Sequence, residues 1–272
     1  MLKTGKLLRL RRLSLAGDGR HLLVPLDHSV SDGPIVPAGQ WDDLLRALVD
    51  GGADGIIVHK GRARSFAPDI LKNCALVVHL SASTACSADV DAKVLVADVE
   101  EALRLGADAV SVHVNIGSDT EARQLSDLGA VARSCDAWGM PLIAMVYPRG
   151  PRIEDPRDPV LLAHLANVAA DLGADMVKTS VALPVERMAE VVAASPIPVL
   201  AAGGPPDGSD LVEYGTAVMA TGCRGLAIGR RIFSAPSPAS LVSRLSAVVH
   251  GDMGTSHDMG MTTPSTFVAG VA

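Results

Sequence analysis

The chain has few aromatic residues and no excess of positive charge. Phe, Trp and Tyr make up 3% of its 272 residues, and the formal net charge is −6. Surfaces that bind nucleic acids need a basic electrostatic field and aromatic rings on which bases stack. We therefore exclude nucleic acid as a partner.

Long apolar runs are also missing. Gly, Asp, Pro or Arg interrupts every apolar stretch well before the ~18 residues that a membrane-spanning helix needs. The N-terminus shows no apolar core followed by a small-residue cleavage site, which is the pattern of a signal peptide. These absences predict a cytoplasmic protein without a membrane partner.

Cysteine is scarce and follows no motif spacing. Cys74, Cys86, Cys135 and Cys223 form no CxxC pair, so we expect reduced thiols. A GxGxxG motif is also missing after the first strand-like run, which argues against a dinucleotide-binding fold. A doubly wound sheet is therefore the weaker of the two architectures that the strand pattern allows.

Lysine is the rarer of the two strong cations, with 6 residues against 18 arginines. One of them, Lys178, lies near the end of the apolar run 174–180, which resembles a buried strand. Because the chain usually uses Arg where charge alone suffices, a lysine in an apolar setting suggests chemistry that needs a deprotonated amine. Attack on a ketone to form a Schiff base is such chemistry. A lysine that reaches from the strand end into water is the structural alternative.

Short apolar runs alternate with helical patterns along most of the chain. Helical periodicity is clearest at 119–138 and after the Asp158 cap. Eight strand–helix units predict an α/β fold of the (β/α)8, or TIM barrel, type over residues 1–250. The eight runs are Leu22–Leu26, Gly55–Val58, Leu76–Leu80, Ala109–Val114, Leu142–Val146, Met176–Val177, Val199–Ala201 and Gly225–Ile228.

The two ends of the chain differ from the barrel pattern. The first 16 residues combine Lys and Arg with Leu, which predicts an amphipathic helix packed on the domain or on a neighbouring subunit. A transit peptide or a membrane-surface helix is the alternative. Residues 251–272 are rich in Gly, Met, Ser and Thr without a period, and we predict a flexible tail there.

A repeated Gly-Ala-Asp tripeptide indicates the direction of the units. It occurs at 52–54, 106–108 and 173–175, where each copy ends a helix and begins a strand. Asp54, Asp108 and Asp175 therefore belong to the N-terminal face of the barrel, where the usual role of a polar residue is stability. Polar residues that follow the strands belong to the opposite, catalytic face.

Two residues on the predicted catalytic face suit proton transfer beside an amine. Asp27 emerges from the first strand, and a buried carboxylate there is expected to pair with Lys178 across the barrel mouth. Capping of loop amides is the alternative role of Asp27. Tyr147 ends the fifth strand, next to the sixth strand with Lys178, and its phenol can donate or accept a proton. A packing ring is the alternative for Tyr147.

Glycines after the last two strands predict an anion site. Gly203 and Gly204 follow the seventh strand, and Gly229 and Arg230 follow the eighth. Paired glycines let backbone N–H groups approach an anion, and barrels usually bind phosphate at these two loops. Arg230 adds a guanidinium that can donate two hydrogen bonds at once.

Histidines leave a metal site open as an alternative. His59, His79 and His113 end the second to fourth strands and, with Asp27, would supply enough ligands for zinc. Against this, no strand carries an HxH pair. Lys60 follows His59 and is a competing amine, which we place in the loop after the strand.

Six motifs together resemble the archaeal-type class I aldolase family. They are LDHSVSDGP, VHKG, VYPRG, VKTS, AGGP and IGRRIF, in this order along roughly residues 1–250. The resemblance implies a TIM barrel in which Lys178 forms the Schiff base, Asp27 accepts a proton and Tyr147 donates one. It implies a cytoplasmic homo-oligomer that needs no metal or other cofactor. It also implies substrate and phosphate contacts at His28, Ser29, Val30, Ser31, Pro148, Arg149, Gly203, Gly204, Gly229 and Arg230.

The substrates that the family uses are phosphorylated ketones and aldehydes. Its members include fructose-bisphosphate aldolases, 2-amino-3,7-dideoxy-threo-hept-6-ulosonate synthases and bacterial 2-amino-4,5-dihydroxy-6-oxo-7-(phosphonooxy)heptanoate synthases. The excess of Arg and the motif LDHSVSDGP most resemble the last branch, which condenses dihydroxyacetone phosphate with aspartate semialdehyde for aminohydroxybenzoate-type secondary metabolism. Many relatives have Gly where this chain has Ser29, which could alter the donor pocket.

The loop after the fifth strand has mixed charge, which bears on the acceptor. This pattern suits the zwitterionic head group of aspartate semialdehyde at least as well as the second phosphate of a fructose bisphosphate. A metal-dependent barrel hydrolase and a non-catalytic assembly subunit are the alternatives from other functional classes. The charged residues of this loop are Arg149, Arg152, Arg157, Glu154, Asp155 and Asp158.

Overall fold

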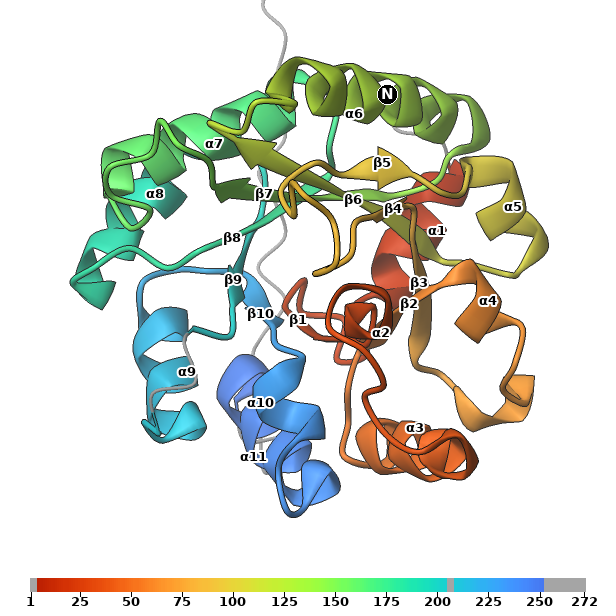
Figure 1. The fold of residues 1–272 in the computed structure, drawn as a ribbon. Helices are drawn as coiled ribbons and strands as arrows, with labels where there is room; N and C mark the ends of the chain where they lie inside the picture. The colour runs from red at the N-terminus through yellow and green to blue at the C-terminus, as the bar shows by residue number, and fades with distance from the viewer. Residues whose placement is uncertain (1–3, 205–207, 252–272) are drawn as a thin grey trace, which may run out of the picture.

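The computed structural model describes residues 4–204 and 208–251. Within these ranges, eight parallel strands close into a barrel in the order β1-β10-β9-β8-β7-β6-β3-β2 (Figure 1). The predicted TIM barrel is therefore confirmed. The strands are β1 (His21–Pro25), β2 (Gly55–His59), β3 (Ala75–His79), β6 (Ala109–Ile116), β7 (Leu142–Pro148), β8 (Met176–Thr179), β9 (Val199–Ala202) and β10 (Gly225–Ala227).

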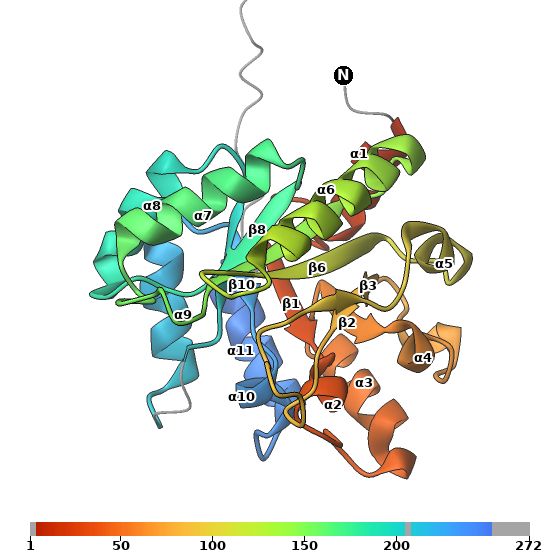
Figure 2. The same cartoon turned by 45° about the horizontal axis from the view of Figure 1, so that its top comes forward.

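Helices surround the barrel (Figures 1 and 2). Several begin at aspartates whose side chains accept hydrogen bonds from the first free backbone N–H groups, as Asp98, Asp158 and Asp210 do. A small antiparallel hairpin of β4 (Ser81–Ala82) and β5 (Val94–Leu95) follows β3. The helices are α1 (Thr4–Arg12), α2 (His28–Ser31), α3 (Trp41–Asp50), α4 (Lys60–Ala63), α5 (Val99–Arg104), α6 (Glu121–Trp138), α7 (Pro159–Asp171), α8 (Met188–Ala194), α9 (Leu211–Ala220), α10 (Arg230–Phe233) and α11 (Pro238–His250).

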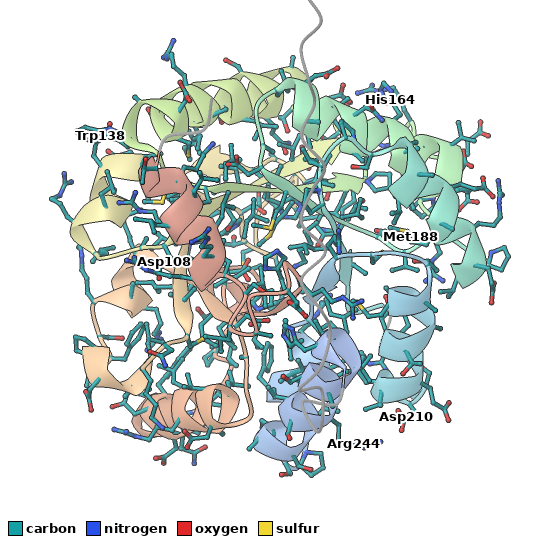
Figure 3. The ribbon with its side chains drawn as sticks, turned by 180° about the vertical axis from the view of Figure 1, so that it is seen from behind. Asp108, Trp138, His164, Met188, Asp210 and Arg244 are labelled. Carbon is teal, nitrogen blue, oxygen red and sulfur yellow. The ribbon has the colours of Figure 1, made fainter. Side chains whose placement is uncertain are left out.

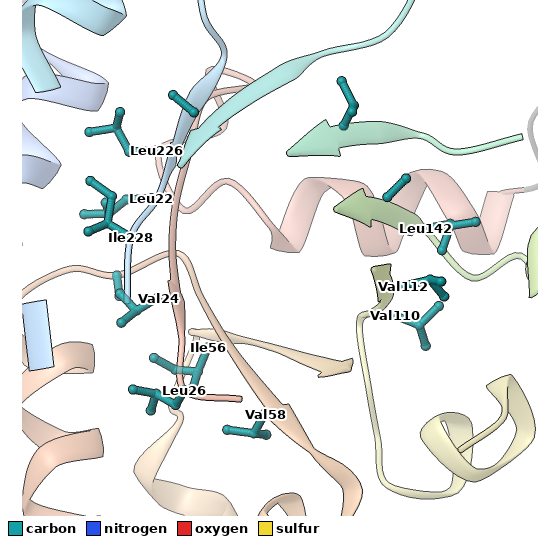
Figure 4. Packing of buried hydrophobic residues seen from close by; sticks show 14 of the residues in the cluster. Leu22, Val24, Leu26, Ile56, Val58, Val110, Val112, Leu142, Leu226 and Ile228 are labelled. Carbon is teal, nitrogen blue, oxygen red and sulfur yellow. The ribbon is translucent and has the colours of Figure 1, made fainter. Parts of the chain in front are cut away.

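Alternation along the strands divides the core into two apolar layers. On β7, Leu142 and Ala144 belong to the large cluster between the strands and the helices, which Figure 4 shows in part. Ile143 and Met145 belong to a smaller cluster inside the barrel. Because both faces of each strand are buried, the strands are predominantly apolar, as is usual for parallel sheets. Full burial of a Leu, Ile or Met side chain contributes about 1.5–3 kcal/mol to the free energy of folding.

The N-terminal end of the barrel is closed by α1, which lies across it when the molecule is seen from behind (Figure 3). Leu13, which follows the helix, is fully buried and packs with the cluster inside the barrel. Lys6 pairs with Asp175 at 2.8 Å, and Arg12 pairs with Asp108 at 3.0 Å. The amphipathic N-terminal helix thus packs on its own domain, which was one of the two predicted positions.

The Gly-Ala-Asp repeat has the orientation that the sequence predicted. Its glycines have positive φ values of 92°, 79° and 95°, which allow the tight turn between helix and strand. Each aspartate then accepts a hydrogen bond from the first residues of the preceding barrel strand. The donors are the backbone N–H groups of Leu22 for Asp54, Leu76 for Asp108 and Leu142 for Asp175. These carboxylates therefore hold neighbouring strands in register.

Three further predictions concerned the C-terminal tail, membrane-spanning helices and the cysteines. The predicted flexible tail lies outside the described residues, apart from Gly251. Across residues 4–204 and 208–251, no helix combines the length and apolarity needed to cross a membrane. All four cysteines lie in these ranges as free thiols; Cys86 is exposed and the other three are buried.

Candidate active site

A cavity of about 700 Å³ opens at the C-terminal mouth of the barrel. Most of the residues predicted for the site line it, although they come from five different segments of the chain. Ser29 lines a smaller neighbouring hollow instead, and Pro148 lies outside the lining as the last residue of β7. The predicted residues in the lining are Asp27, His28, Val30, Ser31, Tyr147, Arg149, Lys178, Gly203, Gly204, Gly229 and Arg230.

Lys178 lies in β8 with its side chain directed into the cavity. Only 7% of the residue is exposed, so it does not extend into bulk water as the structural alternative required. Its register partner on β7 is Met145, which places Tyr147 one inward position further along the neighbouring strand. Among the described residues, no carboxylate lies within 4 Å of the Lys178 amine. The amine is therefore enclosed without an ion-pair partner.

The competing amine, Lys60, is already bound to another side chain. It is the first residue of α4, and its Nζ donates to both carboxylate oxygens of Glu101 on α5, at 2.9 and 3.1 Å. It faces the smaller hollow rather than the main cavity. Lys60 thus lies in a short helix, not in the predicted loop, and its Nζ is held outside the barrel mouth.

Asp27 follows β1 at the beginning of α2, with its carboxylate facing the cavity. It makes no capping hydrogen bond, so its alternative role as a loop cap is not observed. The nearest basic groups are His28 Nδ1 at 3.6 Å and His79 Nε2 at 3.8 Å. The predicted pairing with Lys178 is wrong as a direct contact, because these two histidines occupy the positions nearest the carboxylate. Asp27 Oδ1 is a buried acceptor without a hydrogen-bond donor.

The charge of Asp27 is set by its neighbours more than by burial. Burial alone raises the pKa of this carboxyl group, but electrostatic interactions with the basic side chains of His79, His28 and Lys178 together hold the pKa below its ordinary value. The carboxylate is therefore ionised at neutral pH. An ionised carboxylate with an unused acceptor oxygen can accept a proton from a bound molecule.

His59 and His79 lie side by side at the mouth as neutral rings. Their centroids are 5.2 Å apart, and His79 Nδ1 is 2.8 Å from the hydroxyl of Ser111. Burial lowers the pKa of both imidazoles, to about 4 for His79. Both rings therefore stay uncharged at neutral pH, and His79 can orient Asp27 by a polar contact.

His113 does not end its strand, unlike His59 and His79. It lies within β6 rather than at its end, because β6 continues its pairing with β7 as far as Ile116 and Pro148. Its Nε2 is 2.8 Å from Asn115 Oδ1, and burial lowers the pKa of the ring well below its ordinary value. Among the described side chains, no three His, Cys, Asp or Glu residues are grouped so that they could hold a metal ion.

Tyr147 is held among cationic and aromatic side chains. The residue is 8% exposed, and its ring centroid lies 5.0 Å from that of His113. The guanidinium of Arg149 is 4.9 Å from the ring centroid, and the Lys178 amine is 6.0 Å from it. Tyr147 and Lys178 therefore share one pocket, as the strand order predicted.

The loops after β9 and β10 form one wall of the cavity. An added Cβ at Gly229 would lie 2.4 Å from the carbonyl oxygen of Pro25, so only glycine fits there. Arg231, which is part of the IGRRIF motif but received no predicted role, donates to the carbonyl oxygen of Gly203 at 3.2 Å and thus fixes this loop. Arg230 is exposed, 3.7 Å from Asp32. Arg230 therefore remains available to an anion at the glycine loops.

The mixed charge predicted for the loop after β7 is not found at the cavity. Arg149 and Arg157 line the cavity, but Arg152 pairs with Asp119 at 3.3 Å on the surface. The carboxylate of Asp158 accepts a hydrogen bond from the backbone N–H of Val160. The acidic residues of this loop are absent from the described lining, because capping and solvent contacts direct them outward.

Sequence reasoning missed the β4–β5 hairpin, which forms the wall opposite the glycine loops. Its residues Ser83, Asp91 and Lys93 line the cavity. The hairpin is too short and irregular to show a strand period, so its sequence carries no pattern that predicts it. The one available signal was Lys93, another of the rare lysines, in a polar segment after the third strand.

Comparisons with known proteins agree with this geometry. The model for DeoC/LacD family aldolases matches residues 21–235. The chain is 49% identical over 245 residues to a 2-amino-4,5-dihydroxy-6-oxo-7-(phosphonooxy)heptanoate synthase of Streptomyces griseus, covering 89% of each chain. It is 39% identical to 2-amino-3,7-dideoxy-D-threo-hept-6-ulosonate synthase 1 of Archaeoglobus fulgidus, covering 89% of this chain and 91% of the relative. A solved Schiff-base-forming fructose-1,6-bisphosphate aldolase superposes with a TM-score of 0.80 at 26% identity, covering 90% of this chain and 100% of that one.

Proposed function

Because the chain belongs to the DeoC/LacD aldolase family, we propose that it condenses dihydroxyacetone phosphate with aspartate semialdehyde through a Schiff base on Lys178. The resemblance drawn from the six motifs is confirmed by this membership. The observation that carries the proposal is the enclosed Lys178 amine, which has no carboxylate within 4 Å among the described residues and shares the cavity with Asp27 and Tyr147.

The first half of the reaction joins the donor to the enzyme. The neutral Lys178 amine attacks C2 of dihydroxyacetone phosphate, and loss of water from the carbinolamine gives an iminium ion. We assign the phosphate to Gly203, Gly204, Gly229 and Arg230, where glycines and an exposed guanidinium line one wall. Removal of a proton from C3 then converts the iminium into an enamine.

The second half forms the carbon–carbon bond. The enamine C3 attacks the aldehyde carbon of the acceptor, and the new alkoxide takes a proton to become a hydroxyl group. Water then releases the seven-carbon amino keto phosphate and restores the amine. We assign the C3 proton to ionised Asp27 and the alkoxide proton to Tyr147, since each lines the cavity beside Lys178.

The family likeness supports a cytoplasmic homo-oligomer as the working form. Fructose 1,6-bisphosphate chemistry is the second candidate, because a solved structure with the same fold has that activity in its name. The heptanoate synthase is favoured because the S. griseus relative is 49% identical to this chain over 245 residues. The two candidates differ only in the acceptor, so they share the Lys178 chemistry.

Reductive trapping tests the covalent step. We expect borohydride with dihydroxyacetone phosphate to attach the donor irreversibly at Lys178, as peptide mapping by mass spectrometry would show. Excess chelator should leave turnover unchanged. Labelling at Lys60, or no labelling, would refute the Schiff-base assignment.

Product analysis tests the acceptor. We expect the purified protein to condense dihydroxyacetone phosphate with aspartate semialdehyde much faster than with glyceraldehyde 3-phosphate, measured by mass spectrometry of the products. A faster fructose 1,6-bisphosphate product would replace the acceptor while leaving the barrel and the Lys178 chemistry in place.

A further inference from the structure

The barrel mouth has a second polar wall that the proposed donor contacts do not use. In the closed order of strands, β3 lies four positions from β9 in either direction, so the two strands face each other across the barrel. The β4–β5 hairpin follows β3, and the proposed phosphate loop follows β9. The hairpin therefore faces the phosphate wall across the cavity.

The chemistry of the donor decides what this wall contacts. In dihydroxyacetone phosphate the phosphate is attached through C1, Lys178 joins C2, and the new bond forms at C3. C1 and C3 are on opposite sides of the carbon that is attached to the enzyme. With the phosphate on the β9–β10 wall, C3 points toward the hairpin, and the acceptor aldehyde must approach from there.

Among the described residues, two cations on this side form no ion pair within 4 Å. Lys93 donates one hydrogen bond, to the hydroxyl of Ser83 across the hairpin. Arg149 extends from the end of β7, with its guanidinium 4.9 Å from the centroid of the Tyr147 ring. Within the described part of the chain, neither Lys93 nor Arg149 has a carboxylate within 4 Å. Both line the cavity, so they can receive an anionic group.

A carboxylate lies beside these two cations. Burial and then the charge of Arg149 lower the pKa of Lys93, whereas the nearby carboxylate of Asp91 acts in the opposite direction. The charges of Lys93, Arg149 and Asp91 therefore act on one another. Asp91 also lines the cavity, and among the described residues it has no basic group within 4 Å.

The backbone of Asp91 is fixed in place by the barrel. Its carbonyl oxygen accepts hydrogen bonds from Asn115 Nδ2 at 2.9 Å and Gln124 Nε2 at 2.8 Å. Both donors are buried, one on β6 and one on α6. The Asp91 backbone, from which the carboxylate extends, is therefore anchored to rigid elements of the barrel.

We propose that Lys93, Arg149 and Asp91 form the subsite for the amino acid head group of the acceptor. Lys93 and Arg149 bind its carboxylate, and Asp91 binds its ammonium group. Two cations and one anion complement a zwitterion, whereas the terminal phosphate of a sugar phosphate would meet Asp91 with the same sign of charge. This assignment rests on the proposed function, because it takes aspartate semialdehyde as the acceptor.

A pair of acceptors separates the two halves of the subsite. Aspartate semialdehyde is 2-amino-4-oxobutanoate, and 4-oxobutanoate is the same aldehyde acid without the amino group. Asp91→Asn should lower kcat/KM for aspartate semialdehyde by about 10- to 100-fold, the effect of losing one charged hydrogen bond, and leave 4-oxobutanoate unchanged or faster. Lys93→Met should lower kcat/KM for both acceptors by a similar factor.

Two measurements keep the outcomes distinct. Borohydride capture of dihydroxyacetone phosphate reports donor binding and folding, and it should equal wild type in both variants. Lys72→Met is the matched lysine control, because Lys72 pairs with Asp50 on the surface away from the cavity. Its kinetics with either acceptor should match those of wild type.

Several results would overturn the subsite. If Asp91→Asn lowered kcat/KM equally for both acceptors, Asp91 would not contact the amino group. Unchanged kinetics of Lys93→Met with both acceptors would exclude Lys93 from carboxylate binding. If wild type captured the donor yet condensed neither acceptor, the proposed function itself would fail, and the subsite with it.

Discussion

The two ends of the barrel use aspartate in different ways. At the N-terminal end, the buried Asp54 accepts hydrogen bonds from the backbone N–H groups of Leu15 and Leu22, both at 2.6 Å. At the C-terminal mouth, Asp27 Oδ1 is buried without a donor, and the nearest basic groups are 3.6 and 3.8 Å away. One carboxylate is saturated by its own protein, and the other is not.

The cations of the two ends differ in the same way. Lys6 forms an ion pair with Asp175 at 2.8 Å and fastens α1 to the barrel. Lys178 has no carboxylate within 4 Å among the described residues, although only 7% of it is exposed. Buried polar groups normally satisfy one another, so unsatisfied groups gathered in a cavity indicate that a ligand completes them. Mutations should therefore change stability at one end and turnover at the other.

The largest expected effect is at the mouth. Lys178→Arg keeps a positive charge but has no lone pair that can attack a ketone, so it should be as inactive as Lys178→Ala. We expect turnover to fall by roughly 10⁶-fold, the size of the loss when a covalent nucleophile is removed. Steady-state kinetics and borohydride capture would measure this. Residual capture in Lys178→Arg would show that another amine carries the reaction.

The next effect concerns proton transfer. Tyr147→Phe removes the hydroxyl group and keeps the ring beside His113 and Arg149. We expect turnover to fall by ~10²–10⁴-fold, as for the loss of a general acid or base, while capture of the donor survives. Turnover equal to wild type would leave Tyr147 with a packing role only.

At the closed end, Asp54→Ala should change stability instead. It leaves two backbone N–H groups and His250 without their acceptor, so the free energy of unfolding should fall by about 3 kcal/mol. The value of kcat per folded molecule should stay unchanged. The exposed Asp171→Ala on α7 is the control, with less than about 0.5 kcal/mol expected. Lost activity in well-folded Asp54→Ala would contradict this division between the ends.

The smallest expected effect is a pH dependence of stability, which arises from His250 at the N-terminal end of the barrel. His250 bonds to Asp54 and to Asp18, each at 3.0 Å, and these bonds raise its pKa above the ordinary value despite burial. A raised pKa contributes stability that is complete below the ordinary histidine value of about 6.5 and is lost as the pH rises through the pKa of the folded state. Neighbouring His21 stays neutral over that range, because burial lowers its pKa.

Thermal unfolding at about pH 6 and about pH 9 measures this contribution. From the lower to the higher pH, the melting temperature of wild type should fall further than that of His250→Gln. His164→Gln, at an exposed site on α7, is the control and should follow wild type. If His250→Gln also follows wild type, His250 adds no pH-dependent stability.

The strands and the assignment of residues to the two ends of the barrel could largely be predicted from the sequence. Each of the eight predicted runs became a barrel strand with ends within one or two residues, because burial on both faces imposes continuous apolar sequence. The Gly-Ala-Asp repeat determined which residues face which end, since a helix stop followed by a strand start has only one direction. The order of the strands along the chain was therefore enough to assign Asp27, Tyr147 and Lys178 to one cavity.

Tertiary structure alone decided the contacts within that cavity. Asp27 was expected beside Lys178, but the folded chain places His28 and His79 nearest to it. The acidic side chains of the loop after β7 are absent from the described lining, and Asp91 of an aperiodic hairpin supplies a carboxylate at the mouth instead. Sequence periodicity reports which face of a strand is buried, because burial repeats along the chain. It does not report which loops meet across a closed barrel, because those contacts depend on strand order and loop packing between residues far apart in the chain.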